Sequence, residues 1–300
     1  MSSRSQRAQI AAETVQFVKN GWYIHPVVGH VDFSQSVSDA VRNTRHFAPE
    51  DFETLFSERD AIVAKESRST PAHTIVANMT TLEAARTLLA EDPSPVLALN
   101  FASAKNPGGG FLGGSQAQEE SLARASAMYE CINVVRGFYG TNRACESCLY
   151  THHMIYSPSV PVFRDDNDEL LPSPYQVSIL TAPAVNRGAL QANEPSRLAD
   201  IAPTMLERID RLLAIAVVMG YRRLILGAWG CGVFRNDPVE VAAWFAELLN
   251  GPCYGHMFET VMFAVLDQTK GGDVIAPFHR TFPGSALHLE TTGQTGGREC

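Results

Sequence analysis

The chain of 300 residues is poor in basic residues, has six cysteines and contains no long apolar run. Lysine and arginine number 24 against 32 acidic residues, which gives a formal net charge of −8. Because Lys and Arg supply most of the affinity of nucleic-acid-binding proteins, this deficit argues against direct DNA binding. An anionic ligand would have to be attracted locally, which backbone N–H groups at helix N-termini can do without charged side chains.

The cysteines are irregularly spaced along a long chain, which is not the pattern of a disulfide framework. Residues 1–14 lack the apolar run of a signal peptide, and the most apolar stretch, residues 212–219, is too short to span a bilayer. We therefore expect a soluble, cytoplasmic protein that does not bind membranes. Its 45% share of hydrophobic residues is ordinary for a globular protein, and its length is sufficient to bury a sizeable core.

Strand-like and helix-like segments alternate along most of the chain. Strands are expected at residues 73–77, 96–101, 150–156, 177–182, 223–226 and 258–266, and helices at residues 8–19, 50–65, 80–90, 116–135, 204–219 and 238–249. This alternation predicts an α/β sandwich with a largely parallel or mixed sheet. Ligands bind beyond the carboxyl ends of the strands in such sheets. The Gly-containing loops at residues 106–114 and 229–234 directly follow strands, so we expect both to lie there.

A glycine run followed by two glutamates is the segment richest in chemistry. Gly108, Gly109 and Gly110 allow positive φ angles and a close approach of the backbone to a ligand. Amides of such a loop can converge on phosphate oxygens. Glu119 and Glu120 fall in the first turns of the helix expected to begin near residue 116. Neighbouring side chains on a helix diverge by about 100°, so we expect the two carboxylates to point in different directions.

These residues by themselves support two interpretations. A carboxylate beside phosphate-binding amides is a workable acid/base group for the leaving oxygen of a sugar. Acidic residues near a helix N-terminus are also common complements to the helix dipole, with no catalytic role.

The wider sequence resembles the bacterial-type poly(ADP-ribose) glycohydrolases, a divergent branch of the macrodomain fold. That family carries GGG, a gap of about six to eight residues, and QEE; here residues 111–117 form the gap. The resemblance includes residues 78–86, 150–171 and 227–236 (GAWGCGVFRN) and runs from about residue 8 to about residue 282.

The resemblance implies a macrodomain-like three-layer α/β/α sandwich with a mixed central sheet and an N-terminal helical extension. The expected division is an extension over residues 1–70, a catalytic core over residues 71–283 and a flexible tail over residues 284–300. The extension is expected to pack on the core.

The activity that the resemblance implies is hydrolysis of the ribose–ribose O-glycosidic bond, mainly from the chain end, with no metal or cofactor. Glu120 would be the catalytic acid/base and Glu119 would position the scissile linkage through a ribose. The substrate-binding residues implied are Asn100, Asn106, Gly108, Gly109, Gly110, Gln118, Gly230, Cys231, Gly232, Val233 and Phe234. The implied partners are poly(ADP-ribose) or ADP-ribosylated proteins, and the product is ADP-ribose.

Cysteines and histidines elsewhere offer competing sites. Cys145 and Cys148 lack the second pair of a usual zinc site, and His152 and His153 adjoin an expected strand, so they would point to opposite faces. We expect no metal site there. Cys231 has no base at a diagnostic spacing. Residues 230–233 resemble the loop that binds the diphosphate in the family, so the expected role of Cys231 is to line this loop.

Three functions remain open from the sequence. The first is an exo-acting poly(ADP-ribose) glycohydrolase. The second is a hydrolase of the same fold that removes single ADP-ribose groups from proteins or acyl esters. The third is a non-catalytic ADP-ribose reader. The intact QEE argues against a reader, which has no need of the acid, whereas the first two functions share nearly every residue considered.

Overall fold

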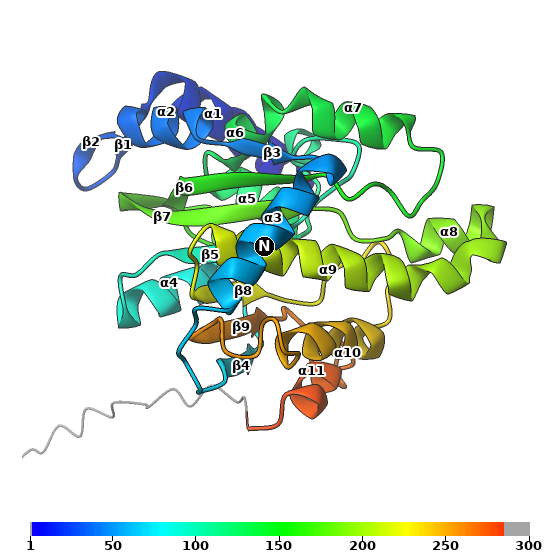
Figure 1. Ribbon diagram of the computed structural model, residues 1–300. Helices are drawn as coiled ribbons and strands as arrows, with labels where there is room; N and C mark the ends of the chain where they lie inside the picture. The colour runs from blue at the N-terminus through cyan, green and yellow to red at the C-terminus, as the bar shows by residue number, and fades with distance from the viewer. Residues whose placement is uncertain (1, 285–300) are drawn as a thin grey trace, which may run out of the picture.

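The computed structural model describes residues 2–284 and shows a mixed seven-stranded sheet between two layers of helices (Figure 1). The strands of this sheet are β3 (Arg45–Phe47), β4 (His73–Ala77), β5 (Val96–Phe101), β6 (Met154–Arg164), β7 (Leu170–Ala182), β8 (Arg223–Leu226) and β9 (Thr260–Ala264). Their order is β3-β6-β7-β5-β8-β9-β4, with β6 antiparallel to both of its neighbours and the other pairs parallel. The predicted mixed sandwich is confirmed.

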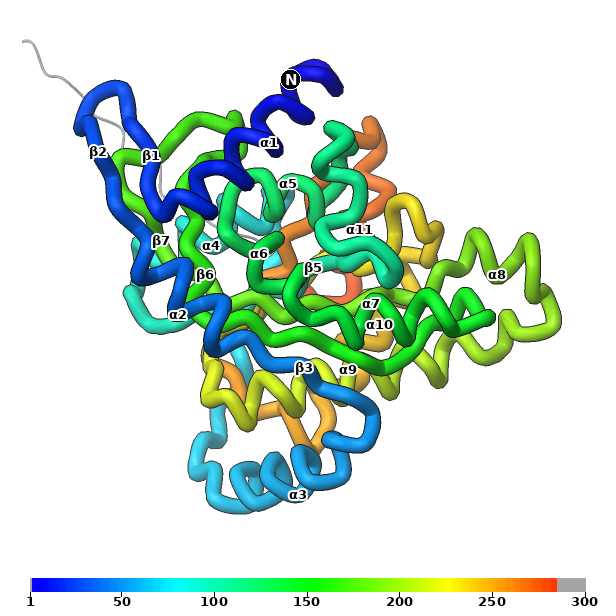
Figure 2. Tube along the Cα trace, turned by 90° about the horizontal axis from the view of Figure 1, so that it is seen from above, coloured from blue at the N-terminus to red at the C-terminus, as the bar shows by residue number. Residues whose placement is uncertain are grey.

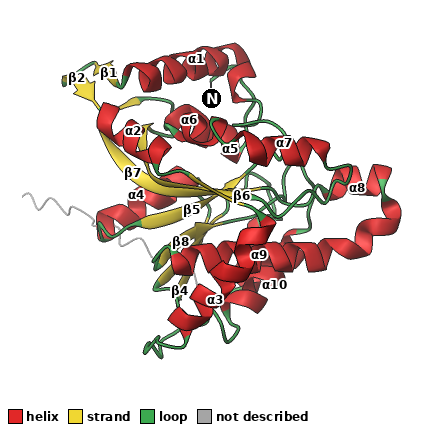
Figure 3. Cartoon of the chain, turned by 45° about the horizontal axis from the view of Figure 1, so that its top comes forward, coloured by secondary structure: helices red, strands yellow, loops and turns green. Residues whose placement is uncertain are grey.

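Helices cover both faces of the sheet (Figure 3). One layer contains α1 (Arg4–Asn20), α2 (Ser34–Arg42), α4 (Thr81–Glu91), α5 (Gln118–Ala125), α6 (Met128–Asn133) and α7 (Arg136–Ala144). The other contains α3 (Phe52–Val63), α8 (Arg187–Asn193), α9 (Ile201–Val218), α10 (Pro238–Leu249) and α11 (Ile275–Thr281). Side chains alternate along β5 between these layers: Leu97 and Leu99 join one core cluster, and Val96 and Ala98 join the other.

The long helix predicted over residues 116–135 is wrong, because the chain breaks between α5 and α6. Ser126 forms an isolated bridge with Val162, and Ala127 N–H donates to the Pro161 carbonyl at 3.0 Å. The Ser126 hydroxyl also donates to the Leu122 carbonyl, which would accept from the backbone N–H of Ser126 in a continuous helix. Apolar periodicity continues through the break, which is why the sequence did not reveal it.

The strand expected at residues 150–156 begins later, at Met154. His152 and His153 therefore precede the strand, and the argument that they point to opposite faces of it is wrong. His153 instead lies 2.9 Å from His46 of β3, ring nitrogen to ring nitrogen. Within residues 2–284, no group of three or more His, Cys, Asp or Glu side chains is arranged to hold a metal ion.

The N-terminal seventy residues are helical in large part, as predicted, but they also supply strands. β1 (Trp22–His25) and β2 (Gly29–Asp32) form a hairpin, and β3 joins the central sheet. α1 lies beside α5 (Figure 2). Its Arg4 and Arg7 donate to the carbonyls of Gly113 and Gly114 at 3.0 and 2.9 Å. The extension therefore supports the back of the Gly-rich loop.

The boundaries assigned to the extension, core and tail stay predictions, and the expected disordered tail lies outside the described residues. Within residues 2–284, none of the helices combines the length and the apolar character needed to span a membrane. The cytoplasmic location also stays a prediction.

Candidate active site

The candidate site lies where β5 ends and α5 begins. Gln118, the first residue of α5, accepts from Phe101 N–H at 2.9 Å and donates to the Leu99 carbonyl at 2.8 Å. Its carboxamide also donates to the Thr81 hydroxyl. These bonds attach the helix N-terminus to the strand. The side chain of Gln118, predicted to bind substrate, is thus engaged by the protein itself.

Glu119 is buried against the end of the sheet, with 3% of its surface exposed. Its carboxylate accepts from Ser103 N–H at 2.7 Å and from Asn100 Nδ2 at 3.3 Å. Asn100 Nδ2 donates in addition to the Thr181 hydroxyl of β7. Burial raises the pKa of Glu119 to about 8, reinforced by the neighbouring Glu120 and opposed by the hydrogen bonds. Burial therefore favours the protonated form of Glu119.

Glu120 is half-buried and held at one oxygen only. Its Oε1 accepts from Gly110 N–H at 3.0 Å, whereas its Oε2 has no hydrogen-bond partner among the described residues. The two carboxylates thus engage different groups of the protein. Both nevertheless approach the glycine loop, because a Cβ on Gly109 would lie 2.4 Å from Glu120 Oε1 and 3.1 Å from Glu119 Oε2.

The glycine loop requires glycine at two of its three positions. Gly108 and Gly109 have φ angles of +67° and +59°, which L-residues with a Cβ rarely adopt. Gly109 N–H closes a turn by donating to the Asn106 carbonyl at 3.0 Å. Because this turn brings Gly109 directly over the two carboxylates, the loop sets the position of both.

The second Gly-containing loop, residues 229–234 after β8, leaves the same end of the sheet as the glycine loop, as expected, because β8 pairs in parallel with β5. The N–H groups of Gly232, Val233 and Phe234 donate to no described residue, so three successive amides are free to bind an anion. The Val233 side chain is 81% exposed, which leaves its backbone as the binding group. Burial raises the pKa of the Cys231 thiol to about 12, which favours a lining role over a nucleophilic one.

Gly230 and Phe234 each lie against a neighbouring side chain, Asn236 and Tyr150 respectively. Gly230 has a φ of +76°, and a Cβ there would lie 2.3 Å from Nδ2 of Asn236, which donates to the Val185 carbonyl. The ring of Phe234 is half-buried, 6.1 Å from that of Tyr150.

Ser103 and Tyr150 were not predicted as site residues. Ser103 acts through its backbone N–H, which any residue except proline supplies, so no side-chain pattern reveals it. Tyr150 has a left-handed φ of 60°, which only the folded chain shows.

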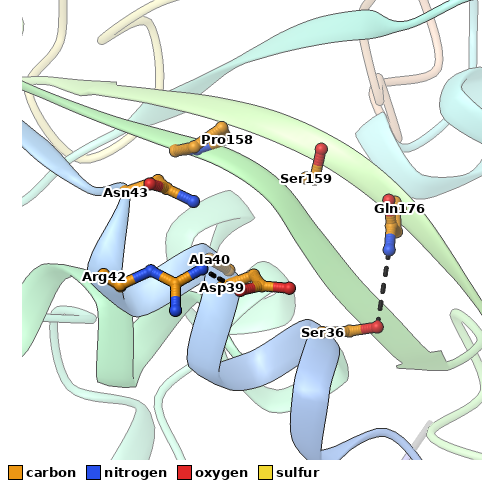
Figure 4. A pocket seen from close by; sticks show the side chains of 8 residues that line it. All are labelled: Ser36, Asp39, Ala40, Arg42, Asn43, Pro158, Ser159 and Gln176. Atoms are coloured by element: carbon orange, nitrogen blue, oxygen red, sulfur yellow. Dashed lines mark hydrogen bonds and ion pairs between the residues drawn. The ribbon is translucent and has the colours of Figure 1, made fainter.

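A polar crevice of about 390 Å³ lies elsewhere, between α2 and the strands β6 and β7 (Figure 4). It is lined by Ser36, Asp39, Ala40, Arg42, Asn43, Pro158, Ser159 and Gln176. Gln176 precedes Ala182, which pairs with the end of β5, by six residues, or about 20 Å of strand. The crevice therefore contains none of the predicted site residues.

The sequence and the structure were compared with known proteins. The family model for the microbial-type poly(ADP-ribose) glycohydrolase catalytic domain matches residues 11–165. No curated protein sequence matches the chain. Among solved structures, poly(ADP-ribose) glycohydrolase from Thermomonospora curvata is 44% identical, with a TM-score of 0.87 over 93% of this chain and 100% of that one.

Two structures with bound ligands are also similar. The Thermomonospora curvata enzyme bound to the inhibitor ADP-HPD is 43% identical, with a TM-score of 0.82 over 92% of this chain and 99% of that one. Poly(ADP-ribose) glycohydrolase from Deinococcus radiodurans in complex with ADP-ribose is 47% identical, with a TM-score of 0.77 over 82% and 97%.

A macrodomain-like sandwich with carboxylates and free amides at the carboxyl ends of its strands defines an enzyme of the glycoside hydrolase class. With more than half of its length matched by the family model, the chain belongs to the microbial-type poly(ADP-ribose) glycohydrolase family.

Replacing Glu119 by Gln should change how stability depends on pH. A carboxyl whose pKa is 4.5 when unfolded and about 8 when folded contributes stability that is present in full below pH 4.5 and is lost as the pH rises through about 8. Glu119→Gln lacks this titration. Urea denaturation of both proteins at pH 5 and pH 9 should therefore show wild type losing at least about 1 kcal/mol relative to the variant. Parallel pH profiles would contradict a buried, protonated Glu119.

Proposed function

We propose that Glu120 is the acid/base catalyst that cleaves the terminal ribose–ribose bond of poly(ADP-ribose). The observation that carries this proposal is that the Glu120 carboxylate is hydrogen-bonded to the protein through only one of its two oxygens. The bond from Gly110 N–H fixes Oε1, while Oε2 has no hydrogen-bond partner among the described residues and belongs to a half-buried side chain, which leaves it available for proton exchange with substrate. Glu119, in contrast, is bonded through both oxygens and buried.

In the proposed reaction, protonated Glu120 gives its proton to the leaving 2′-oxygen as the glycosidic bond breaks. An oxocarbenium-like centre develops at the anomeric carbon of the terminal ribose. Water attacks this carbon and loses a proton to Glu120, which restores the acid, so that one water is consumed and one ADP-ribose released. Most glycosidases divide these steps between two separated carboxyl groups. Here Glu120 serves both, and Glu119 positions the ribose.

Free amides support the assignment of the diphosphate to the second loop. The N–H groups of Gly232, Val233 and Phe234 are available to phosphate oxygens, and such binding requires no basic side chain. The negative net charge of the chain is compatible with this mode of binding a polyanion. Phe234 would pack against the terminal ribose, and Asn106 with the glycine loop would hold the distal ribose and part of the diphosphate. We expect no direct contact with DNA.

Exo action is tested by sizing the products of polymer digestion. Because the proposed site binds a terminal unit, we expect monomeric ADP-ribose alone at early times. Early appearance of oligomers would overturn exo action. Mono-ADP-ribosylated protein serves as a parallel substrate, and its cleavage at a rate equal to that of the polymer would overturn the preference for ribose–ribose bonds.

Chelation should leave the activity unchanged. The proposed chemistry uses a carboxyl proton and backbone amides, neither of which depends on a metal ion. The rate of ADP-ribose release is measured before and after treatment with EDTA and gel filtration. A loss of activity that a divalent cation restores would contradict the proposal.

A further inference from the structure

Two exposed cations, Lys105 and Arg143, lie beside the glycine loop. Lys105 belongs to the loop that carries Gly108–Gly110, and its Nζ lies 6.0 Å from the centre of the Tyr150 ring. Arg143, in the last turn of α7, donates to the Lys105 carbonyl at 2.6 Å. Tyr150 in turn packs against Phe234 of the second loop. These contacts form a continuous strip from α7, across the glycine loop, to the second loop.

The charge of this strip is not neutralised by an ion pair in the part of the chain that the structure describes. Neither Lys105 nor Arg143 forms an ion pair with any carboxylate among residues 2–284. Lysine is scarce in this acidic chain, which has four, and one of them lies on the proposed catalytic loop. Two adjacent uncompensated cations therefore produce a local positive potential beside the site.

The strip is also rigid at its aromatic end. Tyr150 has a φ of 60°, a conformation that a bulky residue keeps only when its surroundings impose it. The guanidinium of Arg208, which is completely buried, donates to the carbonyls of Leu149 and Tyr150 at 3.0 and 3.4 Å. A fixed Tyr150 ring can hold the flexible Lys105 ammonium in place through a cation–π contact.

We propose that Lys105 and Arg143, organised by Tyr150, form a subsite for the diphosphate of the second ADP-ribose unit, the unit that carries the leaving 2′-oxygen. This inference rests on the proposed function. The amides of the second loop account for the diphosphate of the terminal unit. The polymer repeats a diphosphate in every unit, so the adjacent one also needs a place on the enzyme surface. Lys105 and Arg143 supply positive charge beside the glycine loop, and ammonium and guanidinium groups are suited to phosphate oxygens.

The subsite is tested by comparing polymer kinetics with product binding. Lys105→Ala and Arg143→Ala should each raise KM for poly(ADP-ribose) roughly fivefold, and the double variant more, with kcat within about twofold. The Kd of ADP-ribose, which occupies the terminal-unit site alone, should stay unchanged by calorimetry. The slope of log(kcat/KM) against log[salt] should become shallower by about 0.7 for each phosphate that the variant no longer neutralises.

Matched controls separate this subsite from the net charge of the protein. Arg136→Ala removes an exposed cation from the opposite end of the same helix, and Lys65→Ala removes an exposed lysine after α3. Both should keep the wild-type KM, and Lys105→Arg should restore it. An unchanged KM in the Lys105 and Arg143 variants, or an equal rise in the controls, would overturn the subsite. Weakened ADP-ribose binding in those variants would also overturn it, by showing damage to the terminal-unit site.

Failure of the proposed function is distinguishable from failure of the subsite. Normal polymer cleavage by a Glu120→Gln variant would reject Glu120 as the acid/base, whereas the change in KM and salt slope reports on the second unit whichever residue transfers the proton.

Discussion

Glu120→Gln should reduce the hydrolysis of poly(ADP-ribose) by at least about 10³-fold, within the range that a general acid/base contributes. The amide oxygen of Gln can still accept the Gly110 N–H, so the loop keeps its position, but the amide can neither donate a proton to the leaving oxygen nor accept one from water. The affinity for ADP-ribose should stay within tenfold, about 1.4 kcal/mol. Single-turnover release of ADP-ribose and calorimetric binding measure the two effects.

A matched control for this variant is Glu53→Gln, which makes the same change at an exposed glutamate in the first turn of α3. It should retain wild-type rates. If Glu120→Gln instead hydrolyses the polymer at a normal rate, proton transfer belongs to another group, and the assignment of Glu120 is wrong. A large loss of ADP-ribose affinity would mean that Glu120 binds the product rather than acting on the bond.

Gly109→Ala should reduce kcat by about 100-fold or more while the protein still folds. The added methyl would lie 2.4 Å from Glu120 Oε1 and 3.1 Å from Glu119 Oε2, at a backbone φ of +59° that alanine resists. Both carboxylates must then move, and displacement of catalytic groups by about 1 Å costs about this much in rate. Polymer hydrolysis and circular dichroism are measured on the purified variant.

Gly113→Ala is the matched control within the same loop. A Cβ at Gly113 would meet no atom within 4 Å, and its φ is outside the left-handed range. This variant should hydrolyse the polymer at the wild-type rate. If kcat falls equally in the two variants, the loop tolerates a side chain at neither position. The loss of activity in Gly109→Ala would then not be caused by contact of the added methyl with the two carboxylates.

Much of the sheet was predictable because the sequence signals for its strands lie within the strands themselves. The bounds predicted for β4, β5, β8 and α10 coincide with those observed. In each case a short apolar run or a Pro at a helix start carries the information within a few residues. The helix over residues 116–135 failed for the opposite reason, since its break depends on pairing with a strand that lies some thirty-five residues further along the chain.

The candidate site likewise contains residues that local motifs identify and contacts that they do not reveal. GGG, QEE and the downstream glycine loop identify Glu119, Glu120 and the two loops, because glycine and acidic residues are needed there for local geometry and chemistry. Positive φ angles were expected in the GGG run, and Gly108 and Gly109 adopt them, whereas Gly110 has a φ of −106°. The backbone donor from Ser103 and the contact of Tyr150 with Phe234 leave no local trace in the sequence.

The sequence by itself determined that this is an acidic α/β protein with a glycine loop, a carboxylate pair and a second glycine loop, since composition, periodicity and motif spacing are properties of the chain. The tertiary structure decided which carboxylate is buried and which is hydrogen-bonded at one oxygen only. It also brought Lys105, Arg143 and Tyr150 together. Those outcomes depend on burial and on contacts between distant segments, and neither exists until the strands pair and the helices pack on them.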